Sequence, residues 1–227
     1  MSKLILMNDV STELEESNLM PGDDDVPASE LGNKQVDQIV PYFYSKINRV
    51  DILFSSDAKR ILKLVHKLRL QSKDNRISSN DTRKFKGLRE RSLGVLNRSL
   101  IPMTSDVFCH SRILAEDGES ILQCRARVMN CLGGICKEHS TKRILIVSHP
   151  LLCQIATNAI LHKGHTLYTE FWNKKGSFIV FDFNQGKYGL KWEFHSAFNA
   201  IDDSSYSTED IYNKLLSKAG ARAGSGS

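Results

Sequence analysis

The sequence has no apolar run that approaches the roughly 18 residues of a membrane-spanning helix, although 41% of its 227 residues are hydrophobic. The run nearest the amino terminus, Leu4 to Met7, is too short for the apolar core of a signal peptide. The chain has five cysteines, whose odd number and scattered spacing fit neither a disulfide framework nor a zinc site. We therefore expect no membrane span and an intracellular, cytoplasmic protein in a reducing compartment, and we leave a nuclear location open.

Metal-ligand patterns and aromatic stacking platforms are missing as well. The seven histidines show no metal-ligand spacing. Residues 59–98 carry thirteen Lys and Arg against three acidic residues, but Phe85 is the only aromatic residue among them, which argues against a platform for single-stranded nucleic acid. We expect no metal, no other cofactor and no nucleic acid partner.

Charge is divided unevenly along the chain. Residues 1–40 carry nine acidic residues against two lysines, whereas residues 59–98 are strongly basic. The basic segment could form a surface for an anionic partner, or the two segments could face each other and neutralise locally. We favour local neutralisation.

Apolar strand patterns alternate with helical patterns along most of the chain. Short apolar runs at 4–7, 51–56 and 143–148 predict buried strands, and the segments between them show helical spacing. Pro41 is expected to kink the first long helix or end it early. Two alternating runs, at 177–183 and 187–194, predict a hairpin around Asn184-Gln185-Gly186. We read residues 13–25 and 71–86 as loops.

This alternation predicts an α/β fold with a mostly parallel central sheet and helices on both faces. Residues 1–201 form the expected domain. Residues 202–227 are polar and read as a flexible tail, whose Gly-Ser-Gly-Ser end is typical of an added linker. In such sheets ligands bind at the carboxyl edge of the strands, so Asn8 and Asp9, which follow the first strand, lie at the expected site.

The stretch Leu4 to Glu13 resembles the opening of the histidine phosphatase (phosphoglycerate mutase-like) superfamily. In that family the strand ends in Arg-His-Gly, followed by a Glu-Thr-Glu-like run, and the histidine takes the phosphoryl group. Here Asn8, Asp9 and Val10 stand at the three motif positions, while Thr12 and Glu13 match. The resemblance implies a phosphoglycerate mutase-like fold whose nucleophile motif is replaced.

Further matches follow in the order that the family has them, from about Lys3 to Asn199. By resemblance, Arg60 takes the place of the second phosphate-binding arginine, Glu90 that of the acidic proton donor, and His149 that of the second active-site histidine, with Pro150 in place of the usual glycine. The segments that carry the matches are Asp25–Gln35, Ser55–Arg60, Leu88–Gly94, Gly118–Ser120 and Val147–His149.

The replaced motif changes the expected electrostatics of the site. Asn8 removes a cation, Asp9 replaces an imidazole with a carboxylate, and Glu15 stands where the family usually has asparagine. Two like unit charges about 4 Å apart repel by on the order of 4 kcal/mol in a partly shielded site. We therefore expect the site to repel a phosphate dianion, and we expect Arg60 to pair with Asp9 or Glu90 rather than with a ligand.

The favoured function is that of a pseudophosphatase, which acts by protein interaction or scaffolding with an unknown partner, a homodimer being one option. One alternative is a phosphoric monoester hydrolase or mutase with residual activity through Arg60, Glu90 and His149. Another is a non-catalytic binder of phosphorylated small molecules that uses Arg60, His149 and Asn8. Asp9 could itself be a nucleophile only with a magnesium ion held by further carboxylates, and the position two residues on is Ser11.

Overall fold

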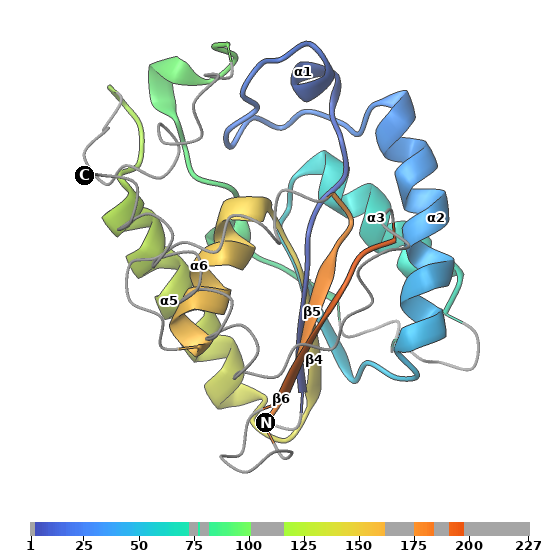
Figure 1. Cartoon of the computed structure of the whole chain (residues 1–227). Coiled ribbons are helices and arrows are strands. Elements are labelled where there is room, and N and C mark those ends of the chain that lie inside the picture. The colour runs from blue at the N-terminus through green and yellow to red at the C-terminus, as the bar shows by residue number, and fades with distance from the viewer. Residues whose placement is uncertain are drawn as a thin grey trace, which may run out of the picture.

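The computed structural model describes residues 3–72, 77, 82–100, 116–161, 175–183 and 191–197. Its elements alternate between strands and helices through most of the chain (Figure 1). In chain order they are β1 (Lys3–Met7), α1 (Glu13–Glu16), α2 (Glu30–Lys46), β2 (Ile52–Ser55), α3 (Lys59–Leu70), β3 (Thr82–Lys84), the 3-10 turns η2 (Lys86–Leu88) and η3 (Gly94–Leu96), α5 (Ile121–Glu138), β4 (Arg143–Val147), α6 (Pro150–Ile160), β5 (Phe178–Asp182) and β6 (Lys191–His195).

The described strands form one sheet in the order β3-β2-β4-β1-β5-β6. β1, β2, β3 and β4 run parallel to one another, whereas β5 is antiparallel to β1 and β6 is antiparallel to β5. At the carboxyl end of β1, Met7 pairs with Val147 of β4 on one side and with Phe178 of β5 on the other. The ends of β1 and β4 and the beginning of β5 therefore meet at one edge of the sheet.

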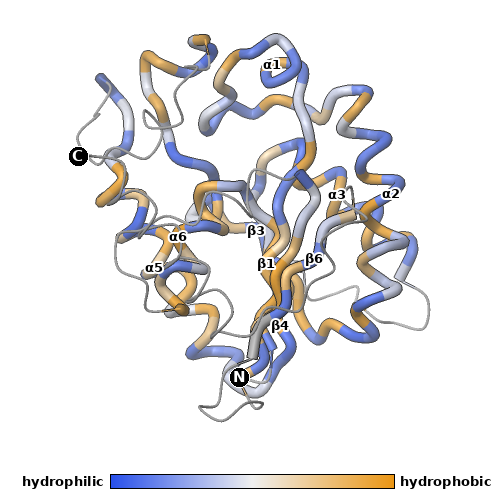
Figure 2. Tube along the Cα trace, in the orientation of Figure 1, coloured by the Kyte–Doolittle hydropathy of each residue, from blue (hydrophilic) through white to orange (hydrophobic). Residues whose placement is uncertain are grey.

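Helices cover both faces of this sheet, with α2 and α3 on one side and α5 and α6 on the other (Figure 1). The side chains of β1 alternate between the two layers: Leu4 and Leu6 pack with α5 and α6, while Ile5 and Met7 pack with α2 and α3. The central strands β1 and β4 are mostly hydrophobic, and the helices alternate in hydropathy (Figure 2). The predicted α/β class, with a mostly parallel sheet and helices on both faces, is confirmed.

Helix caps fix the ends of the elements next to the carboxyl edge. The Ser29 hydroxyl accepts a hydrogen bond from the backbone N–H of Gly32 at the start of α2. A Cβ atom on Gly32 would lie 2.2 Å from the carbonyl oxygen of Ser11, so only glycine lets this turn of α2 approach the chain beyond β1. Pro150 occupies the first position of α6, where its missing N–H costs nothing.

Several local predictions need correction. α2 continues through Pro41 to Lys46, so the expected early end is wrong. The expected loop 13–25 contains the short helix α1, whose capping box joins Thr12 and Glu15, and the expected loop 71–86 contains the edge strand β3. β3 was missed because a polar three-residue strand has no apolar alternation.

The hairpin prediction is confirmed in its pairing, since β5 and β6 are antiparallel; β6 is described from Lys191, and residues 187–190 lie outside the described residues. The turn Asn184-Gln185-Gly186 and the tail 202–227 lie outside the described residues. None of the helices in the described part of the chain is long and apolar enough to cross a membrane.

Candidate functional site

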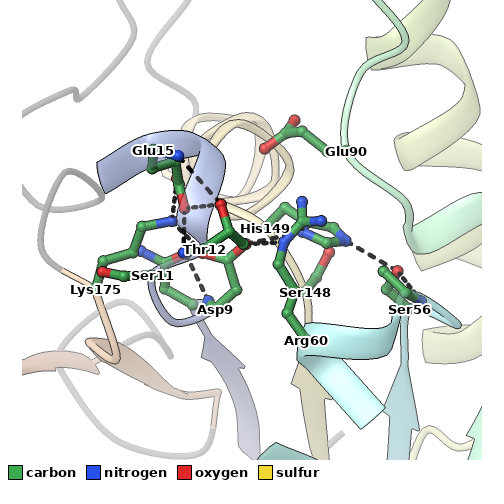
Figure 3. Close-up of polar contacts among 12 residues, drawn as sticks. Asp9, Ser11, Thr12, Glu15, Ser56, Arg60, Glu90, Ser148, His149 and Lys175 are labelled. Carbon is green, nitrogen blue, oxygen red and sulfur yellow. Dashed lines mark hydrogen bonds and ion pairs between the residues drawn. The ribbon is translucent and has the colours of Figure 1, made fainter. Parts of the chain in front are cut away.

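Four segments converge at the carboxyl edge of the sheet (Figure 3). Asn8 and Asp9 follow β1, His149 follows β4, and Arg60 lies in the first turn of α3, which follows β2. Because β5 is antiparallel to β1, the residues that precede it arrive at the same edge, and they include Lys175. The sheet thus brings Asp9, Arg60 and His149 together as the sequence predicted.

The Asp9 carboxylate lies at the centre of this group and is 1% exposed. Its Oδ2 accepts a hydrogen bond from Nε of Arg60 at 2.8 Å and lies 3.1 Å from Nδ1 of His149, while its Oδ1 accepts from Nζ of Lys175 at 2.7 Å. Burial alone would raise the pKa of Asp9, but Lys175, His149 and Arg60 together hold it well below its usual range. Asp9 is therefore an ionised, fully paired carboxylate.

The Arg60 guanidinium is also 1% exposed, and each of its nitrogens has a partner. Besides the Nε contact with Asp9, Nη1 donates to the carbonyl oxygen of Asp24 at 3.1 Å, and Nη2 donates to that of Gly22 at 3.4 Å. Nη2 also lies 3.0 Å from Nδ1 of His149. The expected structural ion pair of Arg60 is confirmed, with Asp9 as its partner.

His149 is buried between these groups and Ser56. Its Nε2 lies 2.9 Å from the Ser56 hydroxyl, while its Nδ1 faces both Asp9 and Arg60. Burial, followed by the charge of Arg60, lowers the pKa of His149 from 6.5 to about 4, although Asp9 opposes this shift. The imidazole is therefore neutral at pH 7.

Lys175 was missed by sequence reasoning. Its Nζ bridges two carboxylates, at 2.7 Å from Asp9 Oδ1 and 2.6 Å from Glu15 Oε1. Burial opposes the charge of Lys175, but Asp9 and Glu15 outweigh it and raise the pKa of this amine. The other carboxylate oxygen of Glu15 accepts hydrogen bonds from the backbone N–H and the hydroxyl of Thr12. Only knowledge that the strand after Lys175 is antiparallel would have placed this lysine at the site.

Glu90 lies to one side of the Asp9 group and comes from the segment after η2 (Figure 3). Its carboxyl oxygens accept hydrogen bonds from the backbone N–H groups of Arg91, at 2.8 Å, and Leu151, at 3.2 Å. Burial raises the pKa of Glu90 despite these two hydrogen bonds, and the negative charge of Asp9 adds to the effect. A raised pKa is the property that a general acid needs.

The sequence model described as histidine phosphatase superfamily (branch 1) matches residues 10–194. This chain belongs to the histidine phosphatase superfamily. No curated protein matches the sequence at a significant level.

Solved structures of phosphatases share the histidine phosphatase fold with this chain. A mutant phosphoserine phosphatase from Entamoeba histolytica, in complex with phosphoserine, matches with a TM-score of 0.69 and 20% identity over 88% of this chain and 100% of its own. A mycobacterial glucosyl-3-phosphoglycerate phosphatase, in complex with VO3, matches with a TM-score of 0.64 and 17% identity over 86% of this chain and 98% of its own. A putative alpha-ribazole-5'-P phosphatase from Escherichia coli gives a TM-score of 0.62 and 17% identity over 81% of this chain and 91% of its own. The expected phosphoglycerate mutase-like fold is confirmed.

Asn8, which by resemblance stands at the arginine position of the motif, is fully buried. Its side-chain Oδ1 accepts a hydrogen bond from the backbone N–H of Asp9 at 2.7 Å, and its own backbone N–H donates to the carbonyl oxygen of Ser177. Asn8 thus ties the end of β1 to the segment before β5. Its predicted role in binding an anion stays a prediction.

The acidic and basic segments face each other, as we favoured. Ion pairs join them at Asp9 with Arg60, Asp25 with Lys59, Asp37 with Lys67, and Asp24 with Arg98. The expectation that the site has an excess of negative charge needs correction. Asp9 and Glu15 are balanced by Arg60 and Lys175, so these four side chains carry no net charge.

The donor set around Asp9 does not suit a divalent metal. Two cations and a histidine surround Asp9, whereas Mg²⁺ prefers several carboxylate or carbonyl oxygens. Among the residues that the structure describes, no group of three or more His, Cys, Asp or Glu side chains is arranged to hold a metal.

Proposed function

We propose that this chain is a catalytically impaired histidine phosphatase-like protein that acts by binding a protein partner. The observation that carries the proposal is the state of Asp9. Asp9 stands at the motif position where the family carries the histidine that takes the phosphoryl group, and it is a buried carboxylate bound by Arg60, Lys175 and His149. A phosphatase of this family needs a neutral nitrogen nucleophile at that point, with its cations available for the phosphoryl oxygens.

Neither Asp9 nor His149 fits the role of the nucleophile. The negative charge of Asp9 is stabilised by two cations, which lowers its nucleophilicity, and the cationic shell opposes the divalent metal that aspartyl-phosphate enzymes use. His149 is neutral at pH 7, but both of its ring nitrogens have partners, and its side chain is 1% exposed. The positive charge of Arg60 is used within the protein itself.

The test is hydrolysis of p-nitrophenyl phosphate and of a panel of phosphosugars by the unaltered chain and by Asn8→Arg/Asp9→His. We expect no turnover above background by the unaltered chain, and turnover by the double variant, because the latter restores both the nucleophile and the cation. Lys63→Met, which changes an exposed lysine on α3, controls for contaminating phosphatase in the preparation. Hydrolysis by the unaltered chain that is lost in Asp9→Ala would show a working aspartate and refute the proposal.

Residual phosphoester hydrolysis is the alternative that one observation favours, namely the raised pKa of Glu90. A carboxyl whose pKa is raised keeps its proton to a higher pH than usual and could donate it to a leaving oxygen. Under this alternative, the unaltered chain hydrolyses phosphate monoesters slowly, and Glu90→Gln lowers kcat by the 10²–10⁴-fold typical of a general acid. Turnover that does not respond to Glu90→Gln would argue against it.

The proposed partner is a protein, and a second copy of this chain is one option. Light scattering across a concentration series distinguishes a homodimer from a monomer that awaits another partner. The cysteine pattern of the sequence supports an intracellular, cytoplasmic location.

A further inference from the structure

We propose that Arg60, Lys175 and His149 form a latent binding site for tetrahedral oxyanions such as phosphate, and that the Asp9 carboxylate closes this site by occupying it as an internal anion. The inference deepens the proposed function and rests on it, because it says why the site would not engage a phosphorylated ligand. It also assigns a role to Lys175, which lies outside every motif match of the sequence.

The contacts of Asp9 are those of a bound anion. Its two oxygens are engaged separately, Oδ1 by Lys175 and Oδ2 by Arg60 and His149, at 2.7, 2.8 and 3.1 Å. The three side chains come from three different parts of the chain and converge on one point (Figure 3). Charge-assisted donors that converge in this way are how proteins hold carboxylate and phosphate groups.

Lys175 supplies the second positive charge of this site. The motif arginine is replaced by Asn8, which leaves Arg60 as the cation that the matched motifs provide. Lys175 reaches the same carboxylate from the segment before β5, so the site has two cations although the motif has lost one. With Asp9 removed, these two cations face Glu15 alone, and the group has a net charge of about +1.

Two substitutions of Asp9 separate the effect of its charge from the effect of its volume. Asp9→Asn removes the negative charge but fills nearly the same space, so the cations lose their counter-ion and an external anion still finds no room. Asp9→Ala removes both the charge and the carboxylate atoms. Only the second change opens a site that an external oxyanion can enter, so the pair tests occupancy and not just electrostatics.

The experiment is calorimetric titration of inorganic phosphate at pH 7 into the unaltered chain, Asp9→Asn and Asp9→Ala. We expect Asp9→Ala to bind phosphate at least about tenfold more tightly than the other two, a difference of about 1.4 kcal/mol. Adding Lys175→Met to Asp9→Ala should abolish most of this gain, whereas adding Lys63→Met, on the exposed side of α3, should keep it. Phosphate should also raise the Tm of Asp9→Ala more than that of Asp9→Asn, because a ligand stabilises the state that binds it.

Equal phosphate affinity of Asp9→Ala and Asp9→Asn overturns the proposal, as does a gain that is insensitive to Lys175→Met. If Asp9→Ala does not fold, Asp9→Ser carries the same expectations with a smaller side chain than aspartate. A second experiment uses a crystal of the unaltered chain soaked in tungstate. We expect no tungstate between Arg60 and Lys175. Tungstate bound there beside Asp9 would refute the assignment of Asp9 as an internal anion. Turnover by the unaltered chain decides the proposed function separately, since none of these binding results requires hydrolysis.

Discussion

His149 should make the stability of this protein depend on pH. Burial and Arg60 lower the pKa of the folded imidazole from 6.5 to about 4, so the unfolded chain binds a proton at a pH where the folded chain does not. The free energy of unfolding therefore rises with pH between about 4 and 6.5. The contribution of His149 is fully present above pH 6.5 and is lost as the pH falls through this window. A single proton gives a slope of at most about 1.4 kcal/mol per pH unit, and the whole shift corresponds to about 3 kcal/mol.

The assay is urea unfolding of the unaltered chain and of His149→Gln, at pH values from 4.5 to 7.5. Because other groups titrate in the same range, the quantity to compare is the difference in the free energy of unfolding between the two proteins. That difference should change by about 3 kcal/mol across the window and then become constant above pH 6.5. His66→Gln, which removes an exposed histidine on α3, should keep the pH dependence of the unaltered chain. A difference that is flat across the window would refute the assignment of a buried, neutral imidazole.

Three further changes test the site and its supports. Asp9→Asn leaves the Arg60 and Lys175 charges without their shared counter-ion and should lower the free energy of unfolding by about 3–5 kcal/mol at pH 7, measured in urea; a loss below about 1 kcal/mol would contradict a paired, buried carboxylate. Because the pKa of Glu90 is raised above 4.5, the stability of the unaltered chain relative to Glu90→Gln should fall as the pH rises from 4.5, and an opposite trend in the unfolding data would contradict that shift. Ser120→Ala removes the capping box of α5 and should cost about 1 kcal/mol in thermal unfolding, whereas Ser120→Thr should keep most of it.

The sequence was sufficient for the layers of the fold because burial leaves a regular pattern. The run Leu4 to Met7 predicted a strand buried on both faces, and the structure buries its residues alternately against two helical layers. In the structure Ser29 and Ser120 cap α2 and α5, two of the segments between the predicted strands that show helical spacing. β3 was not predicted because its three polar residues are held by pairing with β2 and not by burial of an apolar face.

The sequence could predict only those site residues that follow parallel strands. Asp9 and His149 follow parallel strands, so the rule of the carboxyl edge places both of them, and Arg60 follows β2 in the same way. Lys175 precedes a strand that runs the other way, and strand direction is set by tertiary pairing that no local pattern records. Without Lys175, the charges of Asp9 and Glu15 are opposed by Arg60 alone, which is why the sequence predicted an excess of negative charge at the site.

The balance of charge at this edge indicates that the buried Asp9 carboxylate stabilises the folded protein through its ion pairs. A buried carboxylate introduced without partners would cost several kcal/mol, and removing one partner of an existing buried pair typically costs about 3–5 kcal/mol. Here the amine of Lys175 pairs with both Asp9 and Glu15, and Arg60 pairs with Asp9, so the buried carboxylate has its partners. A histidine at position 9, with no other change, would leave Arg60 and Lys175 facing a neutral ring and Glu15. It follows that Asp9→His alone should have a lower free energy of unfolding in urea at pH 7 than the unaltered chain.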